Sequence, residues 1–85
     1  MRIDWSRGFS KEYRHLSKDI QEKFEEKIQL FVENTRHPSL RIKKMSGTDN
    51  IWEASINKNY RWTFEWMPDC IRLRHIGTHD ILQRE

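Results

Sequence analysis

The fold is decided by residues 51–66, which read IWEASINKNYRWTFEW. From Tyr60 to Trp66, aromatic residues alternate with polar ones, as in a β-strand that has one buried face and one polar face. The run from Trp52 to Asn57 alternates in the same way, and Asn57-Lys58-Asn59 supplies turn residues between the two runs. The stretch therefore predicts an antiparallel hairpin.

A third strand is expected after the turn signal Met67-Pro68-Asp69. From Ile71 to Arg74, apolar residues alternate with arginines, which predicts that the arginines point toward the polar side of the sheet. This strand is expected to end at Gly77, with His79 just beyond it. His75 has the parity of the apolar residues, so we expect a partly buried histidine there.

The first half of the chain predicts one strand and two helices. Residues 2–5 are typical of a short strand, and Ser6 is placed to cap the helix that follows. Apolar residues then recur at helical spacing in residues 9–16 and 20–31. The second helix is expected to end near Asn34.

His37-Pro38 stops that helix, because a proline disfavours helical geometry in the preceding residue. In residues 40–43, apolar and basic residues alternate, which predicts a further strand with a basic side. At the other end, Ile81 and Leu82 are expected to pack the end of the chain against the domain. The 85 residues of the sequence predict a single α+β domain, residues 1–85, with two helices on one face of a mainly antiparallel sheet.

Composition and charge narrow the class of protein. The net charge of +3 and a pI near 9.2 suit a polyanionic partner such as nucleic acid. A single cysteine, Cys70, excludes an internal disulfide and fits a reducing compartment. No apolar run approaches the ~20 residues of a membrane span, and Met1 leads into no signal-peptide pattern. We therefore expect a cytoplasmic protein without a membrane partner.

The helices are expected to cover the sheet face that carries Trp62 and Phe64, which leaves the opposite face open to solvent. Side-chain parity places nine polar residues on this open face: Arg41, Lys43, Glu53, Ser55, Arg61, Thr63, Glu65, Arg72 and Arg74. Five of the nine are cationic. Clustered guanidinium groups bind phosphate through paired donors and stabilise negative charge that develops on it.

RNA carries its own nucleophile, so a phosphate-binding Arg61 could serve strand cleavage without a metal. A base withdraws the proton of the 2′-hydroxyl, and that oxygen attacks the adjacent phosphate and releases a 5′-hydroxyl strand. His79 suits one of the two proton transfers, because an unperturbed imidazole titrates near pH ~6.5. Glu53, Glu65 or Asp80 could perform the other.

We expect neither a cofactor nor a metal. A zinc site formed by Cys70, His75 and His79 is disfavoured, because structural zinc sites use four ligands in close pairs.

Several motifs together resemble the RelE/ParE superfamily of toxins from type II toxin-antitoxin pairs. They are His37-Pro38-Ser39-Leu40, Lys43-Lys44-Met45-x-Gly47, the Trp52 to Glu65 pattern and Ile76-Gly77-Thr78-His79-Asp80-Ile81-Leu82. The resemblance implies a twisted sheet of four to five strands packed against two N-terminal helices. It also implies a ribosome-dependent mRNA endoribonuclease that enters the A site, and a cognate antitoxin that wraps around the toxin.

The resemblance also suggests roles for single residues. Arg61 matches the arginine that RelE-like toxins place at the scissile phosphate, and His79 matches a histidine that YafQ-like relatives use. RelE has lysines on the strand that contains Glu53 here, so Glu53 is a candidate substitute for the proton acceptor. The expected catalytic residues are thus Arg61, His79 and Glu53. The expected substrate-binding residues are Arg41, Lys43, Lys44, Arg72 and Arg74.

Three alternatives remain open at this stage. ParE-like inhibition of DNA gyrase needs no catalytic pair, and a RelE-fold protein that only binds RNA or a partner needs none either. Arg61 could be a surface arginine paired with Glu53 or Glu65. Trp52 and Trp66 are expected to be buried rather than to stack on RNA bases, because they share parity with core residues.

Overall fold

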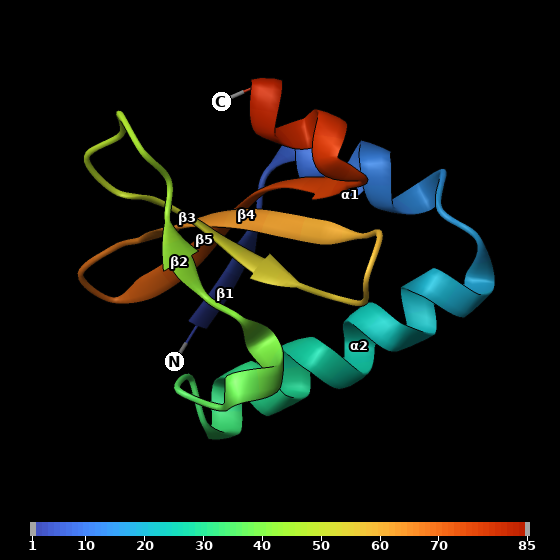
Figure 1. Cartoon of the computed structure of the whole chain (residues 1–85), viewed down its shortest axis with the longest axis horizontal. Coiled ribbons are helices and arrows are strands. Elements are labelled where there is room, and N and C mark those ends of the chain that lie inside the picture. The colour runs from blue at the N-terminus through green and yellow to red at the C-terminus, as the bar shows by residue number, and fades with distance from the viewer. Residues whose placement is uncertain (1, 85) are drawn as a thin grey trace.

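The computed structural model describes residues 2–84 and contains one five-stranded sheet with helices packed on it (Figure 1). In chain order the elements are β1 (Arg2–Trp5), α1 (Arg7–Arg14), α2 (Lys18–Glu33), the 3-10 helix η1 (Pro38–Leu40), β2 (Lys43–Lys44), β3 (Ile51–Ser55), β4 (Arg61–Trp66), β5 (Cys70–Gly77) and the 3-10 helix η2 (His79–Arg84). The strand order is β1-β5-β4-β3-β2. Only the β1–β5 pair is parallel, so the predicted α+β class is confirmed.

Side-chain hydrogen bonds define the starts of both helices, and the start predicted at Ser6 is confirmed. The Ser6 hydroxyl oxygen caps α1 by accepting from the Phe9 amide at 3.1 Å, and Ser17 caps α2 through the Ile20 amide at 3.3 Å. Each cap satisfies an amide that has no partner within the helix. The second helix ends at Glu33, with Asn34 as its C-cap, close to the expected position.

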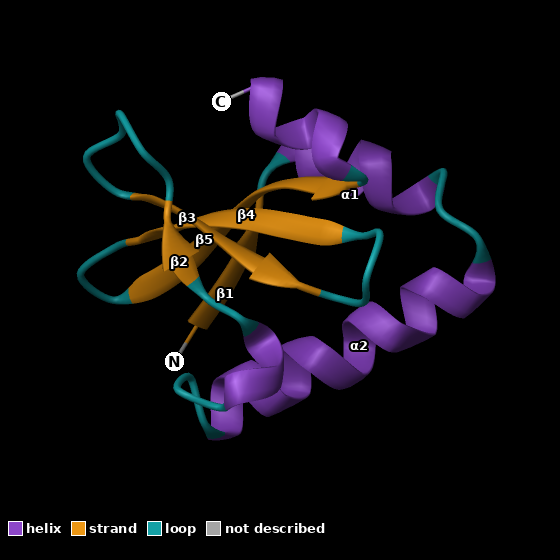
Figure 2. Cartoon of the chain, viewed as in Figure 1, coloured by secondary structure: helices purple, strands orange, loops and turns teal. Residues whose placement is uncertain are grey.

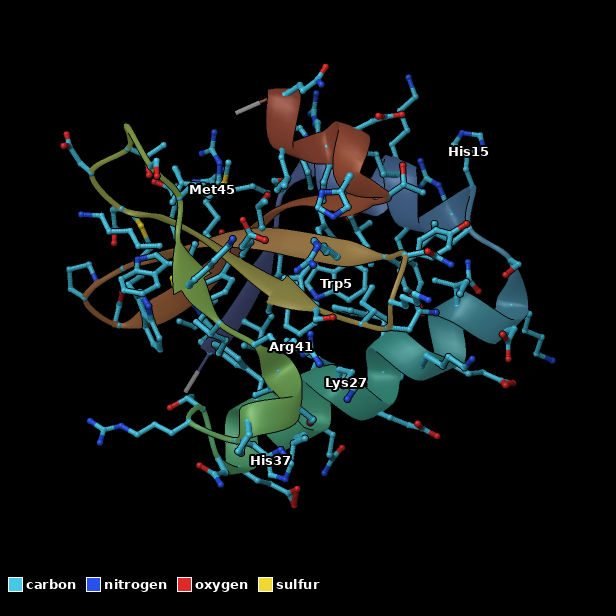
Figure 3. The ribbon with its side chains drawn as sticks, viewed as in Figure 1. Trp5, His15, Lys27, His37, Arg41 and Met45 are labelled. Atoms are coloured by element: carbon cyan, nitrogen blue, oxygen red, sulfur yellow. The ribbon has the colours of Figure 1, made fainter. Side chains whose placement is uncertain are left out.

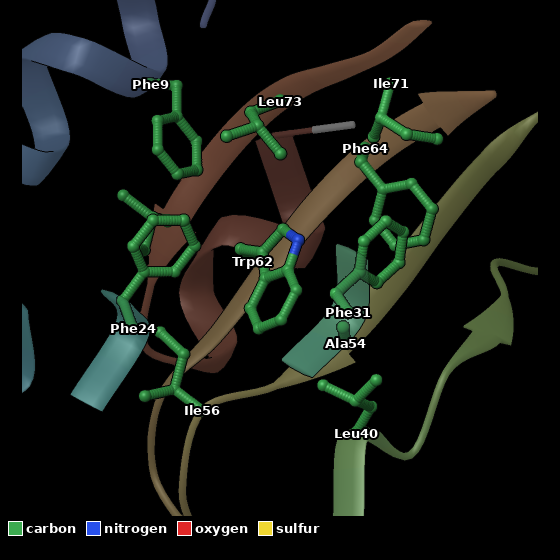
Figure 4. Packing of buried hydrophobic residues seen from close by; sticks show 11 residues of the cluster. Phe9, Phe24, Phe31, Leu40, Ala54, Ile56, Trp62, Phe64, Ile71 and Leu73 are labelled. Carbon is green, nitrogen blue, oxygen red and sulfur yellow. The ribbon is translucent and has the colours of Figure 1, made fainter. Parts of the chain in front are cut away.

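An aromatic core joins α2 to the central strand of the sheet (Figure 4). Phe24 meets Trp62 edge to face, with ring centroids 5.3 Å apart, and Phe31 meets Phe64 at 5.2 Å. All four rings are fully buried, which confirms the prediction that the helices cover this face. Aromatic pairs in this geometry add to the free energy gained from burial alone.

Figure 2 shows α1 and η2 close to one another at the same side of the sheet. Ile81 of η2 is buried, which confirms that the end of the chain packs against the domain. Its side chain lies against Gly77, where an added Cβ would be 2.9 Å from Ile81 Cγ2. The absence of a side chain at residue 77 therefore lets η2 pack closely on β5.

The strand predicted for residues 40–43 is wrong in most of its length. Pro38 begins η1, Leu40 ends it, and Arg41 adopts the left-handed conformation, with φ 48° and ψ 48°. Only Lys43 and Lys44 pair with β3. Arg41 turns the chain, so the alternation of apolar and basic residues on either side of it does not correspond to the two faces of a strand.

The parity assigned to His75 is also wrong, because β5 contains a bulge. Thr63 of β4 is opposite His75 while Phe64 is opposite Leu73, so Arg74 is the additional residue of the bulge in the strand register. Beyond the bulge, Ile76 points into the core in place of His75. His75 is partly buried as expected, but its Nδ1 lies 3.0 Å from Glu12 Oε1 of α1.

The face predicted to be open to solvent is covered in its middle. Glu53 is 4% exposed, Ser55 is 7% exposed and Thr63 is fully buried. The C-terminal η2 contacts both β4 and β5 and covers part of this face. Alternation in a strand distinguishes its two faces, but it does not tell what later segments cover them.

Candidate functional site

Arg61 lies at the start of β4, where a well-defined turn positions it. The Asn57 side-chain oxygen accepts hydrogen bonds from the Asn59 and Tyr60 amides, both at 2.9 Å, and so closes the β3–β4 turn. The strand pairing then sets Arg61 opposite Ser55 of β3 and Gly77 of β5. The Arg61 side chain is 18% exposed and lines a surface cavity.

Glu53 of β3 is the acidic neighbour of this arginine. Its Oε1 lies 3.3 Å from Arg61 Nη1, and its side chain is 5% exposed. Burial of a carboxylate away from water is costly unless a charged or hydrogen-bonding partner compensates it. The Arg61 guanidinium supplies that compensation.

His79 completes a three-residue group, which we name the Arg61–Glu53–His79 cluster. It is the first residue of η2, two positions after the end of β5, and it is exposed. Arg61 Nε donates a long hydrogen bond of 3.4 Å to His79 Nε2. The structure thus brings together the three residues that the sequence predicted as catalytic, and two groups able to transfer protons flank one guanidinium.

Two other acidic candidates lie elsewhere. Glu65 Oε1 is 2.8 Å from Arg74 Nη1, four residues along β4 from Arg61, which corresponds to about 13 Å of strand. Asp80 lines a separate cavity of about 550 Å3 between α1 and η2, together with Glu12 and His75. Glu53 is therefore the carboxylate that the geometry associates with Arg61.

The predicted substrate-binding residues fall into three places rather than on one shared surface. Lys43 is opposite Glu53 in the sheet, whereas Lys44 is opposite Trp52 and so points to the other face. Both lysines are exposed.

Arg72 and Arg74 lie toward the β1 side of the sheet. Arg72 Nε is 4.0 Å from Asp4 Oδ2 of β1, and Arg74 pairs with Glu65 as described above. Strand register places Arg72 on the face that carries Glu65 and Arg61, but both arginines lie away from Arg61 along the strands and pair with carboxylates.

Arg41 does approach Arg61, although not from a strand. The two arginines line one cavity of about 510 Å3, to which α2 contributes Lys27 and the β3–β4 turn contributes Lys58. Sequence reasoning missed both lysines. A signal for Lys27 existed: it follows Phe24 by three residues and precedes Phe31 by four, so it shares their side of the helix.

Solved structures provide the comparison for this fold. YafQ from Escherichia coli strain BL21(DE3) superposes with a TM-score of 0.78 over 96% of this chain and 98% of that chain, at 19% sequence identity. The RelB-RelE antitoxin-toxin complex from Methanococcus jannaschii gives 0.76 over 94% of each chain, at 21% identity. The chain has a RelE-like fold. The YoeB dimer from Staphylococcus aureus agrees, with a TM-score of 0.74 over 93% of this chain and 97% of that chain, at 17% identity.

The RelE-like fold inferred from the sequence motifs is thus confirmed across nearly the whole chain. No protein-family model and no curated protein sequence matches the chain. Among the described residues, no helix is both long and apolar enough to cross a bilayer. Within the same residues, no three His, Cys, Asp or Glu side chains are grouped so that they could hold a metal ion.

Proposed function

We propose that this chain is the toxin of a type II toxin-antitoxin pair and that it cleaves mRNA on the ribosome. The RelE-like fold supports the toxin role, since one structure that shares it is an antitoxin-toxin complex. The same similarity supports a cognate antitoxin as the partner. The nuclease activity is supported by the chemistry of the site.

The observation that carries the proposal is the Arg61–Glu53–His79 cluster. The guanidinium of Arg61, whose side chain is partly exposed, can bind the scissile phosphate and stabilise the charge that grows on its oxygens. Glu53 and His79 contact this guanidinium at 3.3 and 3.4 Å, so both groups able to transfer protons would be near a phosphate that Arg61 binds.

The proposed reaction assigns one proton transfer to each of these two groups. One of the two groups accepts the proton of the 2′-hydroxyl, and the O2′–P bond forms as the bond from phosphorus to the 5′-oxygen breaks. The other group donates a proton to the departing 5′-oxygen. The products are a 2′,3′-cyclic phosphate on one fragment and a 5′-hydroxyl on the other, with no metal in any step.

The proposal is tested by mapping the ends of an mRNA after translating ribosomes have been incubated with the purified protein. We expect new 5′-hydroxyl ends with the wild-type chain and their loss with Arg61→Ala and with His79→Ala. Arg72→Ala is the matched control, because this exposed arginine pairs with Asp4 of β1. Intact mRNA in the presence of the wild-type protein would refute the nuclease assignment. Inhibition of gyrase supercoiling by that protein would instead indicate the ParE-like activity.

A further inference from the structure

The cavity beside Arg61 gathers positive charge from four separate segments. Lys27 of α2, Arg41 after η1 and Lys58 of the β3–β4 turn line it together with Arg61. The other described residues that line it are Ser39, Ser55, Ile56 and Asn57, so none of the described carboxylates lines it. Figure 3 shows the labelled Lys27 and Arg41 close together, where α2 passes the segment between η1 and β2.

Three of these cations are uncompensated within the described part of the chain. Lys27, Arg41 and Lys58 have no carboxylate within 4.0 Å there, whereas Arg72 and Arg74 each have one. Like charges that share a cavity repel one another, and an anion bound among them relieves that repulsion.

Local structure places each of the three side chains at the cavity. Lys27 lies on the side of α2 that carries the buried Phe24 and Phe31. The Asn57 side chain closes the turn that contains Lys58. Arg41 adopts a positive φ of 48°, a conformation that an arginine rarely takes unless its surroundings impose it.

We propose that this cavity binds a backbone phosphate of single-stranded RNA next to the phosphate held by the Arg61–Glu53–His79 cluster. The claim that the ligand is RNA rests on the proposed function. The claim that the cavity binds an anion rests on the four cations alone. Arg61 lines the cavity and belongs to the cluster, so it is the link between the two phosphate positions. Phosphate contacts of this kind position a strand without reading its sequence.

Salt dependence of binding tests the proposal directly. The probe is a short fluorescent 2′-O-methyl RNA strand, which lacks the nucleophile and is not cleaved. The logarithm of the association constant falls linearly with the logarithm of the salt concentration, and for single strands each neutralised phosphate contributes about 0.7 to that slope. The slope can be measured between ~50 and ~200 mM salt. We expect the combined variant Lys27→Gln, Arg41→Asn, Lys58→Gln to reduce the slope by at least about 0.7, to a similar extent for different RNA sequences.

A charge-matched variant with Arg14→Gln, Lys18→Gln and Lys23→Gln is the control, because these exposed cations lie outside the cavity. Its slope is expected to stay close to that of the wild-type chain. If the combined variant fails to fold by circular dichroism, Lys58→Gln alone is measured, since this side chain is exposed in a turn.

An unchanged slope in the cavity variant, or an equal loss in the control, would overturn the proposal. So would a variant that keeps RNA binding but loses binding of polyglutamate, since the cavity would then hold an acidic protein segment. Failure of the phosphate site and failure of the proposed nuclease function give different results. If the slope falls as expected but the wild-type chain cuts no mRNA on ribosomes, the phosphate site stands and the nuclease does not.

Discussion

Arg61 Nη1 lies 3.3 Å from Glu53 Oε1, across the β3–β4 pair and largely shielded from solvent. Removal of the arginine would leave the Glu53 carboxylate buried without its partner, and such a change costs about 3–5 kcal/mol when burial is complete. A loss of activity in Arg61→Ala therefore combines chemistry with stability. A substitution of Glu53 separates the effect on chemistry from the effect on stability.

Glu53→Gln is expected to lower the rate of RNA cleavage at least ~100-fold, the range usual for a lost acid or base. RNA affinity should be unchanged or tighter, because a negative charge beside the phosphate is removed. The glutamine oxygen still accepts from Arg61, so stability should change by about 1 kcal/mol or less. Single-turnover rates and thermal melts measure both effects.

The matched control for that substitution is Glu65→Gln on the same strand. Glu65 pairs with Arg74 at 2.8 Å and lies away from Arg61, so the cleavage rate should remain near that of the wild-type chain. A loss of less than about tenfold in Glu53→Gln would mean that Glu53 only holds Arg61 in place.

A second prediction concerns the close packing of η2 on Gly77. A methyl group at Gly77 would lie 2.9 Å from Ile81 Cγ2, so Gly77→Ala should displace η2 and with it His79. We expect a fall in cleavage rate together with a lower melting temperature. Gly8→Ala is the control: its nearest neighbour would be the Arg74 carbonyl oxygen at 3.8 Å, an ordinary contact. Equal rates in the two variants would contradict the positioning role of η2.

The sequence predicts the hairpin and the cluster well, because both depend on local rules. Alternation sets Glu53 and Arg61 on one face, and a short turn between their strands brings them near each other. His79 follows the strand that pairs with β4, so its proximity to Arg61 also follows from strand order. The helix starts at Ser6 and Ser17 also depend on a local rule, because each serine caps an amide three residues later.

The features that the sequence does not predict depend on packing between distant segments. A bulge at Arg74 adds one residue and leaves no distinctive mark in the residues themselves, yet it reverses the parity of His75. The left-handed turn at Arg41 falls on a residue type that rarely adopts it. The cavity beside Arg61 requires α2, η1 and the β3–β4 turn to meet, which no local pattern encodes.

A third prediction concerns alkaline pH. Burial, together with the 2.8 Å hydrogen bond that Tyr13 donates to Glu25, raises the pKa of Tyr13 from 10.0 to about 12. Because the folded-state pKa is the higher one, the stabilisation is fully present below pH ~10 and is lost as the pH rises toward ~12. The wild-type chain should therefore lose more stability over this range than Tyr13→Phe does.

The size of that difference should be about 1 kcal/mol or less, because Glu25 is exposed and solvent screens the interaction. Urea unfolding at a series of alkaline pH values measures it, and the absorbance of tyrosinate follows the ionisation. If Tyr13→Phe and the wild-type chain lose stability in parallel, neither burial nor the contact with Glu25 raises the pKa of Tyr13 in solution.

The last prediction separates strain from charge at Arg41. At φ 48° a non-glycine residue costs roughly 1–2 kcal/mol, while glycine adopts this conformation without a steric penalty but loses about 0.5–1 kcal/mol more backbone entropy on folding. Arg41→Gly should therefore be more stable than Arg41→Ala by roughly 0.5–1 kcal/mol, which corresponds to a few degrees in Tm for a domain of this size. Both variants lack the guanidinium, so both should lower the salt slope of RNA binding equally. A melting temperature of Arg41→Gly below that of Arg41→Ala would show that Arg41 is not strained, because only the entropy loss of glycine would then remain. A wild-type slope in either variant would show that the charge of Arg41 does not meet a phosphate.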